Sequence, residues 1–468
     1  MYVRRSSALA MLAVVAIVFG ACSSAATTAP SAAPASAAGA SASAGASPTA
    51  APVPTPPADA VAAAATYAAT LGKIGGSVSV LAQWGGSEQT MFTNMIKPFE
   101  DATGITVQYT GSRDEPAILT TGIATGQLPD IAGIPGPAQM SQYATAGKLV
   151  DLSSMLDLSA YNSETPAGLV TLGTVNGKLV GVFMDVSAKG QIWYDPKVVG
   201  DLTSSAPKTW TDLQTLITTD KSKATSPWCF SVASGAASGW PGTDVLESFV
   251  LHEDGPDVYN NWWAGKVKWS DPQIMKAFQD LGDMVANSYG GANQILTANF
   301  ANGGDPLFAT PPGCLFFHQA SFITGLGAFA TATRNTDYNF FPFPAINPSY
   351  AGATEIAGDL FGAFHNTPQS AALMKYLVSS QAQTLFVAAG EFLSANKGVS
   401  TYPNSMNQRL GAIAAGSASS VFDASDQMPS AMQNAFYAGL LQYIQHPDQL
   451  TTVLANLDKV QADAYTTH

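Results

Sequence analysis

Short apolar segments alternate with segments of helical periodicity along most of this chain. Residues 77–81 (SVSVL) are short and rich in β-branched side chains, which indicates a buried strand. Apolar side chains then recur at helical spacing over residues 91–99, with Ser87 as the expected N-cap and Gly104 as the expected stop. Residues 105–109 (ITVQY) form the next expected strand. The segment therefore predicts a β-α-β unit.

The same alternation continues toward the C-terminus. Strands are expected at residues 131–134, 177–183 and 191–194, and helices at residues 60–71, 116–125 and 138–146. Strands that alternate with helices in this way are typical of a mixed α/β fold in which helices cover both faces of a sheet.

The N-terminal residues have the pattern of an export signal. Arg4 and Arg5 precede an uncharged apolar run at residues 8–20, and small residues lead to Cys22. The run is shorter than the ~20 residues of a transmembrane span, so residues 1–21 are interpreted as a signal peptide. A cysteine directly after Gly-Ala resembles a bacterial lipoprotein signal, which implies that Cys22 is lipidated and anchors the protein outside the cytoplasm. A secreted protein with a stray cysteine is the alternative.

A long segment of low complexity follows the signal. Residues 23–66 are almost wholly Ala, Ser, Thr, Pro and Gly, with no aromatic side chain and a single charge. Such a composition cannot bury enough apolar surface to offset chain entropy. We therefore interpret residues 22–74 as a tether between the anchor and the folded part.

Charge and cysteine content exclude several classes of protein. The 468 residues include 20 Lys and Arg against 33 Asp and Glu, which gives a net charge of −13. Nucleic-acid binding needs clustered cations, so that class is disfavoured. Three cysteines cannot form a Cys-cluster metal site, and no nucleotide-binding loop or HExxH motif is present. We expect neither a cofactor nor a resident metal.

Several segments resemble, in order, the extracytoplasmic solute-binding proteins of ABC transporters, in the branch that contains maltose-binding protein. These are residues 97–107 (KPFEDATGITV), 126–132 (GQLPDIA), 177–182 (GKLVGV) and 193–196 (WYDP).

Further strings are similar to a narrower group, the α-glucoside-binding proteins. They are residues 110–114 (TGSRD), 227–229 with 238–244 (PWC and SGWPGTD), 311–314 (PPGC), 340–344 (FFPFP) and 423–429 (DASDQMP). Their shared order makes the resemblance specific.

The resemblance implies a type II periplasmic-binding-protein fold, in which two discontinuous α/β lobes close around a ligand by hinge motion. Crossings between the lobes are expected near residues 185–188, 356–362 and 398–422. The implied first lobe spans residues 75–186 and 360–412, and the second spans 187–359 and 413–468.

A sugar presents apolar C–H faces and a rim of hydroxyls, so its site needs aromatic faces and fixed polar groups. Trp84 ends the first strand at the carboxyl edge of the sheet, where it could face either the cleft or the core. Ser112 and Asp114 follow the second strand at the same edge. Asp114 could accept sugar hydroxyls or cap the helix that begins near Pro116.

Two more candidates lie in the glycine-rich segment 234–244. We expect Trp240 to stack on a sugar face, opposite Trp84. Asp244 could bind hydroxyls or cap the helix at residues 245–251.

The resemblance adds candidates by position. Phe322 lies in a segment that resembles one supplying a stacking aromatic side chain in maltose-binding protein. Tyr437 matches another such position, where the family member has Trp, although its helical spacing also fits core packing. Asp359 lies at the second crossing, where a buried carboxylate requires hydrogen bonds. Lys189 is a weaker candidate, with a solvated lysine as the alternative.

Cys229 and Cys314 remain once Cys22 is lipidated. Two leftover cysteines in an oxidising compartment usually pair, so a disulfide is expected. Two buried free thiols are the alternative.

The resulting hypothesis is a monomeric, lipid-anchored, non-catalytic receptor that captures an α-glucoside or related oligosaccharide and delivers it to an ABC permease. An extracytoplasmic glycoside hydrolase, which needs two carboxylates across the scissile bond, and a surface lectin are the alternatives.

Overall fold

The computed structural model describes residues 53, 55–388, 390–415 and 420–466. The signal peptide, Cys22 and the first part of the expected tether, residues 23–52 and 54, therefore lie outside the described residues. Residues 55–74 of the expected tether are described. Within the described ranges, no helix combines the length and the apolar character needed to cross a bilayer.

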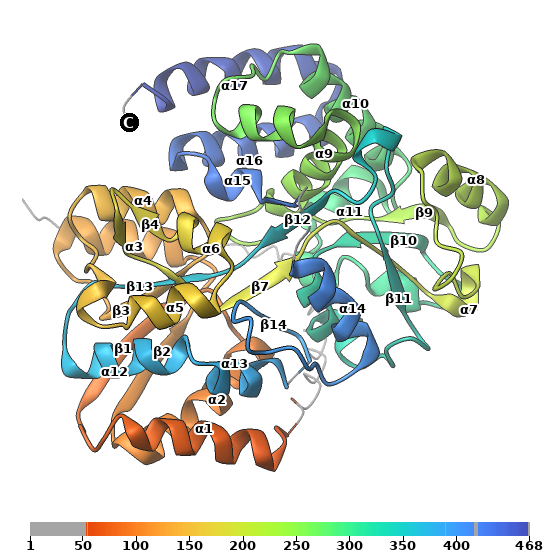
Figure 1. The fold of residues 1–468 in the computed structure, drawn as a ribbon. Helices are drawn as coiled ribbons and strands as arrows, with labels where there is room; N and C mark the ends of the chain where they lie inside the picture. Colours follow the sequence, from red (N-terminus) through yellow and green to blue (C-terminus); the bar gives the residue numbers. More distant parts are fainter. Residues whose placement is uncertain (1–52, 54, 389, 416–419, 467–468) are drawn as a thin grey trace, which may run out of the picture. The chain divides into compact units, whose positions relative to one another are not determined.

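The first lobe is built on a five-stranded sheet of order β2-β1-β3-β13-β6 (Figure 1). Its strands are β1 (Ser77–Ala82), β2 (Thr106–Gly111), β3 (Ile131–Ile134), β13 (Leu360–Ala363) and β6 (Val182–Phe183). Strand β1 runs parallel to β2 and β3, whereas β13 is antiparallel to β3 and β6. The central strand β3 therefore has a parallel neighbour, β1, on one side and an antiparallel neighbour, β13, on the other.

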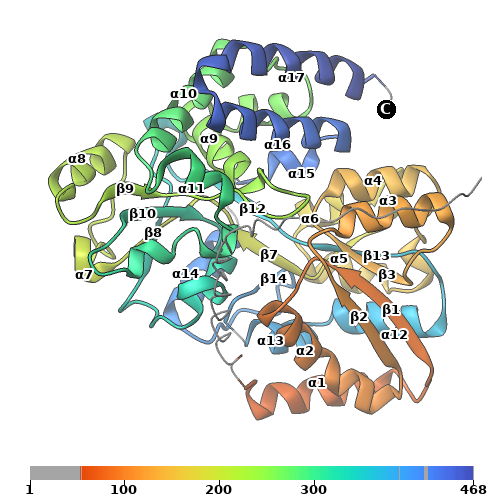
Figure 2. The ribbon, with the colours of Figure 1, turned by 180° about the vertical axis from the view of Figure 1, so that it is seen from behind.

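Helices cover both faces of this sheet. In Figures 1 and 2, α1 (Ala58–Thr70), α2 (Ser87–Thr103) and α13 (Ser380–Val387) lie on one side, with α3 (Glu115–Thr125) and α4 (Pro137–Thr145) on the other. Burial follows the alternation along β1, because Val78 and Val80 join the core under α2, whereas Leu81 joins the core beneath α4. The lobe is completed by α5 (Leu158–Glu164), α6 (Ala167–Leu172), α12 (Pro368–Leu377) and the hairpin of β4 (Thr174–Val175) and β5 (Lys178–Leu179).

The predicted elements of this lobe are present, with two corrections. The single strand expected at residues 177–183 is divided into β5 and β6, which belong to different sheets, and one helix end differs. Gly104 ends α2 in the left-handed conformation, as expected. Ser87, however, is the first helical residue and not the N-cap, which is Gly86. Its hydroxyl instead donates to the carbonyl oxygen of Gly325 (3.3 Å).

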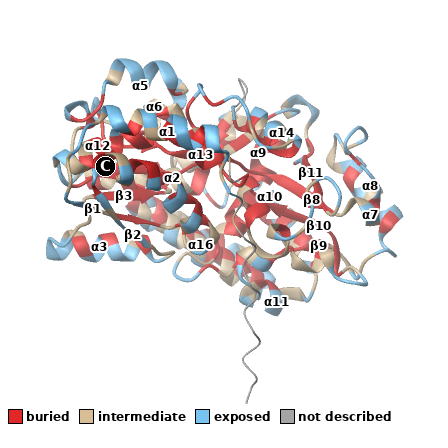
Figure 3. Ribbon diagram, turned by 90° about the horizontal axis from the view of Figure 1, so that it is seen from below, coloured by how far each residue is buried: buried red, intermediate tan, exposed pale blue. Residues whose placement is uncertain are grey.

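The second lobe is built on a four-stranded sheet of order β11-β8-β10-β9. Its strands are β8 (Gln191–Tyr194), β9 (Ser226–Cys229), β10 (Cys314–Gln319) and β11 (Asn339–Pro342). Figure 3 shows these strands buried, while α8 presents an exposed outer face. The helices are α7 (Pro196–Val199), α8 (Trp210–Asp220), α9 (Trp240–Trp263), α10 (Pro272–Ala286), α11 (Gly291–Thr297), α15 (Ala424–Gln427), α16 (Ser430–Gln445) and α17 (Leu450–Ala464).

A third sheet contains a segment at or next to each of the three expected crossings, together with one strand that lies outside them, at residues 393–394. It has the order β14-β7-β12-β15, with strands β7 (Asp185–Ala188), β12 (Thr354–Ala357), β14 (Leu393–Ser394) and β15 (Ser420–Phe422). We refer to it as the crossing sheet. Because β12 pairs with both β7 and β15, we propose that these strands form the hinge.

The position of α14 (Ser405–Ala414) bears on the boundary expected at residue 412. Arg409 on this helix donates to the side chain of Asn339 (2.5 Å), and its guanidinium lies 4.6 Å from the ring centroid of Phe340. Both partners belong to β11 of the second lobe. We therefore propose that the boundary lies before α14.

A disulfide joins the neighbouring strands β9 and β10. Cys229 and Cys314 are bonded, with their Cα atoms 5.4 Å apart. The predicted pairing is confirmed. The bond closes a loop across 85 positions of sequence within the second lobe, which limits the conformational freedom of the unfolded chain.

Candidate binding site

A cavity of about 700 Å³ lies between the two lobes, with the crossing sheet at its floor. On the first-lobe side it is lined by the carboxyl ends of strands of the sheet and by α3 and α4, and on the second-lobe side by α9 and α16. Residues within β7 and β12, and residues that directly follow β7, β12 and β15, complete the lining. Its volume is in the range of pockets that enclose small organic ligands, ~300–1,000 Å³.

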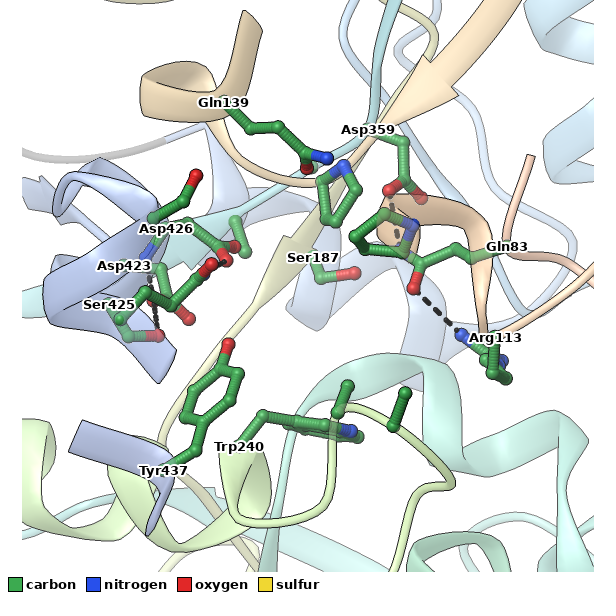
Figure 4. A pocket seen from close by; sticks show the side chains of 18 of the residues that line it. Gln83, Arg113, Gln139, Ser187, Trp240, Asp359, Asp423, Ser425, Asp426 and Tyr437 are labelled. Atoms are coloured by element: carbon green, nitrogen blue, oxygen red, sulfur yellow. Dashed lines mark hydrogen bonds between the residues drawn. The ribbon is translucent and has the colours of Figure 1, made fainter. Parts of the chain in front are cut away.

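One wall of the cavity is aromatic. Trp240 and Tyr437 extend from the second lobe into it, as Figure 4 shows, and Phe322 lies beside Trp240 with ring centroids 5.9 Å apart. Gly239 precedes Trp240 with φ of 115°, and a Cβ there would lie 3.0 Å from the backbone of Tyr437. A glycine at this position therefore lets α9 and α16 approach until the two side chains share one wall.

The opposite wall carries a chain of hydrogen-bonded polar groups. Asp359 accepts from the indole N–H of Trp84 (2.8 Å) and from the amide of Gln83 (2.7 Å). The side-chain oxygen Oε1 of Gln83 in turn accepts a hydrogen bond from Arg113 (3.2 Å), and Arg113 forms an ion pair with Glu88. These bonds fix the Asp359 carboxylate and the Gln83 amide before any ligand arrives.

Lys189 lies at the floor between two carboxylates. Its ammonium is 2.7 Å from Oδ2 of Asp244 and 2.8 Å from Oδ2 of Asp423, and 5.3 Å from the ring centroid of Trp240. Lys189 is only 7% exposed. The alternative that it is an ordinary solvated lysine is therefore wrong.

Carboxylates outnumber cations around the cavity, and burial changes their protonation. Burial and the neighbouring Asp359 raise the pKa of Asp185 well above its usual value. Burial also raises the pKa of Asp244 to about 7. For Asp423, burial opposes ionisation, but attraction to Lys189 and hydrogen bonds from Ser425 and Asp426 hold the pKa below its usual value. Burial thus raises the pKa of Asp185 and Asp244, whereas Lys189 and the hydrogen bonds lower that of Asp423.

Most of the predicted site residues meet in this cavity. Its lining includes Trp84, Trp240, Asp244, Phe322, Asp359 and Tyr437.

Trp84 differs from the other aromatic residues of the lining. It is 2% exposed, and four phenylalanine rings surround it at centroid distances of 5.2–5.7 Å. We therefore propose that Trp84 acts through its bond to Asp359, and not as a face on which a sugar stacks.

The cavity lining among the described residues does not include Ser112 or Asp114. Asp114 is exposed and occupies the N-cap position of α3, yet its side chain makes no capping bond. Its Oδ1 instead accepts from the backbone N–H of Ala236 in the second lobe (3.4 Å), and its own N–H donates to Ser112 Oγ (3.1 Å). Asp114 thus contacts the second lobe, whereas Ser112 has a hydrogen bond inside the β2–α3 loop. The ligand contact expected of each residue stays a prediction.

Sequence reasoning missed several lining residues. These are Gln83, Glu88, Arg113, Gln139, Asp185, Ser187, Asp423, Ser425 and Asp426. Two strings that carry the family resemblance held some of them, since TGSRD contains Arg113 and DASDQMP contains Asp423, Ser425 and Asp426. Single-residue chemistry had no signal for Gln83 or Gln139.

The fold and the cavity define a two-lobed receptor for a small solute. The chain belongs to the bacterial extracellular solute-binding protein family, whose model matches residues 85–384. This class of protein binds its solute without chemical change, so the chain is a receptor and not an enzyme, and the hydrolase alternative is set aside.

Relatives and a solved structure agree with this assignment. The chain is 31% identical over 389 residues to the osmoprotective compounds-binding protein GgtB of Synechocystis sp., covering 82% of this chain and 91% of that protein. It is 27% identical over 392 residues to the alpha-glucosides-binding periplasmic protein AglE of Rhizobium meliloti, covering 79% and 84%. The structure of a chitin oligosaccharide binding protein superposes with a TM-score of 0.72 at 19% identity, covering 84% and 99%. The predicted two-lobed α/β periplasmic-binding-protein fold is confirmed.

Proposed function

We propose that this protein captures an α-glucoside or a related oligosaccharide between its lobes and delivers it to an ABC permease. The observation that carries the proposal is the pairing of two unlike walls across one cavity. Trp240, Phe322 and Tyr437 offer apolar faces for the C–H surfaces of a sugar ring. Asp359 and Gln83, held in place on the opposite wall, offer groups for its hydroxyls.

A further acceptor supports a hydroxyl-rich ligand. Oδ1 of Asp244 has no hydrogen-bond partner among the described residues, although Asp244 is 1% exposed and lines the cavity. Leaving a buried acceptor unpaired costs ~1–3 kcal/mol. A sugar hydroxyl donated to this oxygen would remove that cost on binding.

The names of the relatives favour the same ligand class. One relative is named for alpha-glucosides and another for osmoprotective compounds. A glucoside with two or three rings would fit both the aromatic wall and the volume of the cavity.

Trp240→Ala should weaken sugar binding with little effect on stability. Trp240 is half-buried at the start of α9 and stands at the aromatic wall. By analogy with aromatic anchors at other interfaces, losing the ring should remove ~1–3 kcal/mol of binding free energy, or about 5- to 150-fold in Kd. Calorimetric titration with the best sugar, together with ligand-free melting, measures both quantities.

Trp263→Ala is the matched control, because Trp263 is also half-buried but lies at the end of α9, outside the cavity lining. It should bind the sugar with wild-type affinity. Equal affinities of the two variants would contradict the proposed role of the aromatic wall.

We also propose that Cys22 carries a lipid anchor and that the segment after it tethers the receptor to the membrane. The tether expected over residues 22–74 would then end before α1, because α1 packs in the core of the first lobe. Cys22→Ala should then release the protein into the medium or into a soluble extracytoplasmic pool, as measured by cell fractionation and immunoblotting. A cleaved Cys22→Ala protein that stays in the membrane fraction at the wild-type level would refute the anchor.

A further inference from the structure

Three buried carboxylates converge at the cavity wall, and Asp423 among them belongs to the lining. Glu247 lies on α9 of the second lobe, Glu355 on β12 of the crossing sheet, and Asp423 directly after β15. One oxygen of each lies within 4.8 Å of the others, and none of the three residues is more than 2% exposed. Because they come from three distant parts of the sequence, only the fold brings them together.

Two of these carboxylates have hydrogen-bond donors. Glu247 accepts from the backbone N–H groups of Ala424 (2.8 Å) and Ser425 (3.2 Å), and from the hydroxyl of Tyr259 (3.1 Å). Asp423 accepts from Ser425 Oγ (2.8 Å), and its other oxygen contacts Lys189.

Glu355 differs, because neither of its carboxylate oxygens has a hydrogen-bond partner among the described residues. It is 2% exposed, and one of its oxygens lies within 4.8 Å of an oxygen of each of the other two carboxylates. A buried polar group without a partner is costly. The two unpartnered oxygens of Glu355 therefore point to a bound ligand, because no neighbouring side chain in the described part of the chain supplies a partner for them.

The charge of the cluster supports the same reading. Lys189 is the cation in contact with it, and its ammonium is bonded to Asp244 and Asp423 on the cavity side. That single positive charge faces Asp244, Glu247, Glu355 and Asp423. Buried carboxylates in such excess need protons or a second cation.

We propose that Glu247, Glu355 and Asp423 bind a hard divalent cation, with Ca²⁺ as the best match. Calcium takes oxygen ligands at about 2.3–2.6 Å, so oxygens on opposite sides of one ion lie up to ~5 Å apart. Every pair of ligand oxygens in this cluster lies within 4.8 Å, which is inside that span. Magnesium usually keeps several waters and is bound through one or two carboxylates, so a fully buried set of three carboxylates suits it less well. The ion would connect α9 to both crossing strands and hold Asp423 at the cavity wall, and this inference does not depend on which solute binds.

Terbium luminescence tests the proposal, because Tb³⁺ occupies calcium sites and the Tyr259 ring adjoins Glu247 as a sensitiser. The purified protein is first analysed for bound metal, then treated with a chelator and titrated with Tb³⁺. We expect a saturable signal that Ca²⁺ displaces. Glu355→Gln keeps the shape of the side chain and should weaken Tb³⁺ binding at least ~10-fold, because it removes a charged ligand.

Glu115→Gln is the matched control. Glu115 is fully buried and its oxygens also lack a partner, but it belongs to no group of three carboxylates among the described residues. It should leave Tb³⁺ binding unchanged. The proposal is overturned if Glu355→Gln binds Tb³⁺ as the wild type does, or if the wild type contains no metal and gives no saturable signal.

A melting measurement on the wild type keeps the test decisive if Glu355→Gln does not fold. Ca²⁺ added to the chelator-treated protein should raise its melting temperature, because an ion that binds only the folded state stabilises it. Mg²⁺ should raise it less, because Mg²⁺ loses its waters reluctantly. The absence of any such rise, in protein shown to be metal-free, would overturn the proposal.

Discussion

Trp84→Ala is expected to lower the free energy of unfolding by ~3–5 kcal/mol, the usual cost of truncating a large buried aromatic side chain. The Trp84 ring is enclosed by Phe92, Phe361, Phe386 and Phe392, so its removal leaves a cavity in the core of the first lobe. Its N–H also donates to Asp359, which would lose a donor. Denaturant unfolding, monitored by far-UV circular dichroism and not by tryptophan fluorescence, measures the change.

Trp84→Phe separates packing from hydrogen bonding in the same experiment. It keeps most of the ring but removes the donor to Asp359, so it should cost less stability than Trp84→Ala and still weaken sugar binding. If Trp84→Ala unfolds like the wild type and only its affinity falls, Trp84 is a stacking face and its assignment to the core is wrong.

Lys189→Met is expected to be about as costly, ~3–5 kcal/mol, because it leaves buried carboxylates without their cation. Lys189 contacts both Asp244 and Asp423, and both acids are 1% exposed. Burial alone would lower the pKa of Lys189, but these acids raise it well above its usual value. The methylene stem of the side chain is retained in Met, so the loss measures charge and hydrogen bonding more than packing.

The pH dependence of this loss provides a second readout. In chelator-treated protein without Lys189, the folded-state pKa of Asp423 should rise above the unfolded value. The variant then binds more protons when folded, and its stability should fall as pH rises. The deficit relative to the wild type should therefore shrink as pH is lowered from about 7 toward about 5.

Lys197→Met is the control, since Lys197 is an exposed lysine that pairs with Asp337 at the surface. It should change stability little. A Lys189→Met protein as stable as Lys197→Met at neutral pH would contradict the buried ion-pair network.

The sequence predicted the fold well because its signals are local and repeated. The β-α-β pattern at residues 77–109 depends on strand composition and helical spacing, and both survive in β1, α2 and β2. The error at Ser87 is local too, because serine is a common N-cap but Gly86, with φ of 59°, takes that position. The disulfide was predicted because two cysteines remain after Cys22 and because the expected compartment outside the cytoplasm is oxidising.

The candidate site was predicted less completely because its chemistry is assembled from distant segments. Aromatic residues such as Trp240 and Tyr437 were found through their context and the family resemblance. Lys189 is buried only because Asp244 and Asp423, which lie far along the chain, meet it in the fold. Nothing in the sequence around Lys189 distinguishes it from a solvated lysine.

Asp114 shows that the position of a residue after a strand does not determine the direction of its side chain. Its place after β2 at the carboxyl edge was read correctly, but the direction of its side chain depends on the loop at residues 235–236 of the other lobe. Such a contact between lobes has no local sequence signal.

A thermal-shift screen of mono-, di- and trisaccharides against the wild-type protein tests the proposed function most directly. A ligand that binds only the folded state stabilises it by RT ln(1 + [L]/Kd), about 4 kcal/mol at a thousandfold excess over Kd. The account predicts that α-linked glucosides such as maltose or trehalose raise the melting temperature, and that the β-linked disaccharide cellobiose raises it less. If no saccharide shifts the melting temperature while a solute of another class, such as an amino acid, does, the proposed ligand class is wrong.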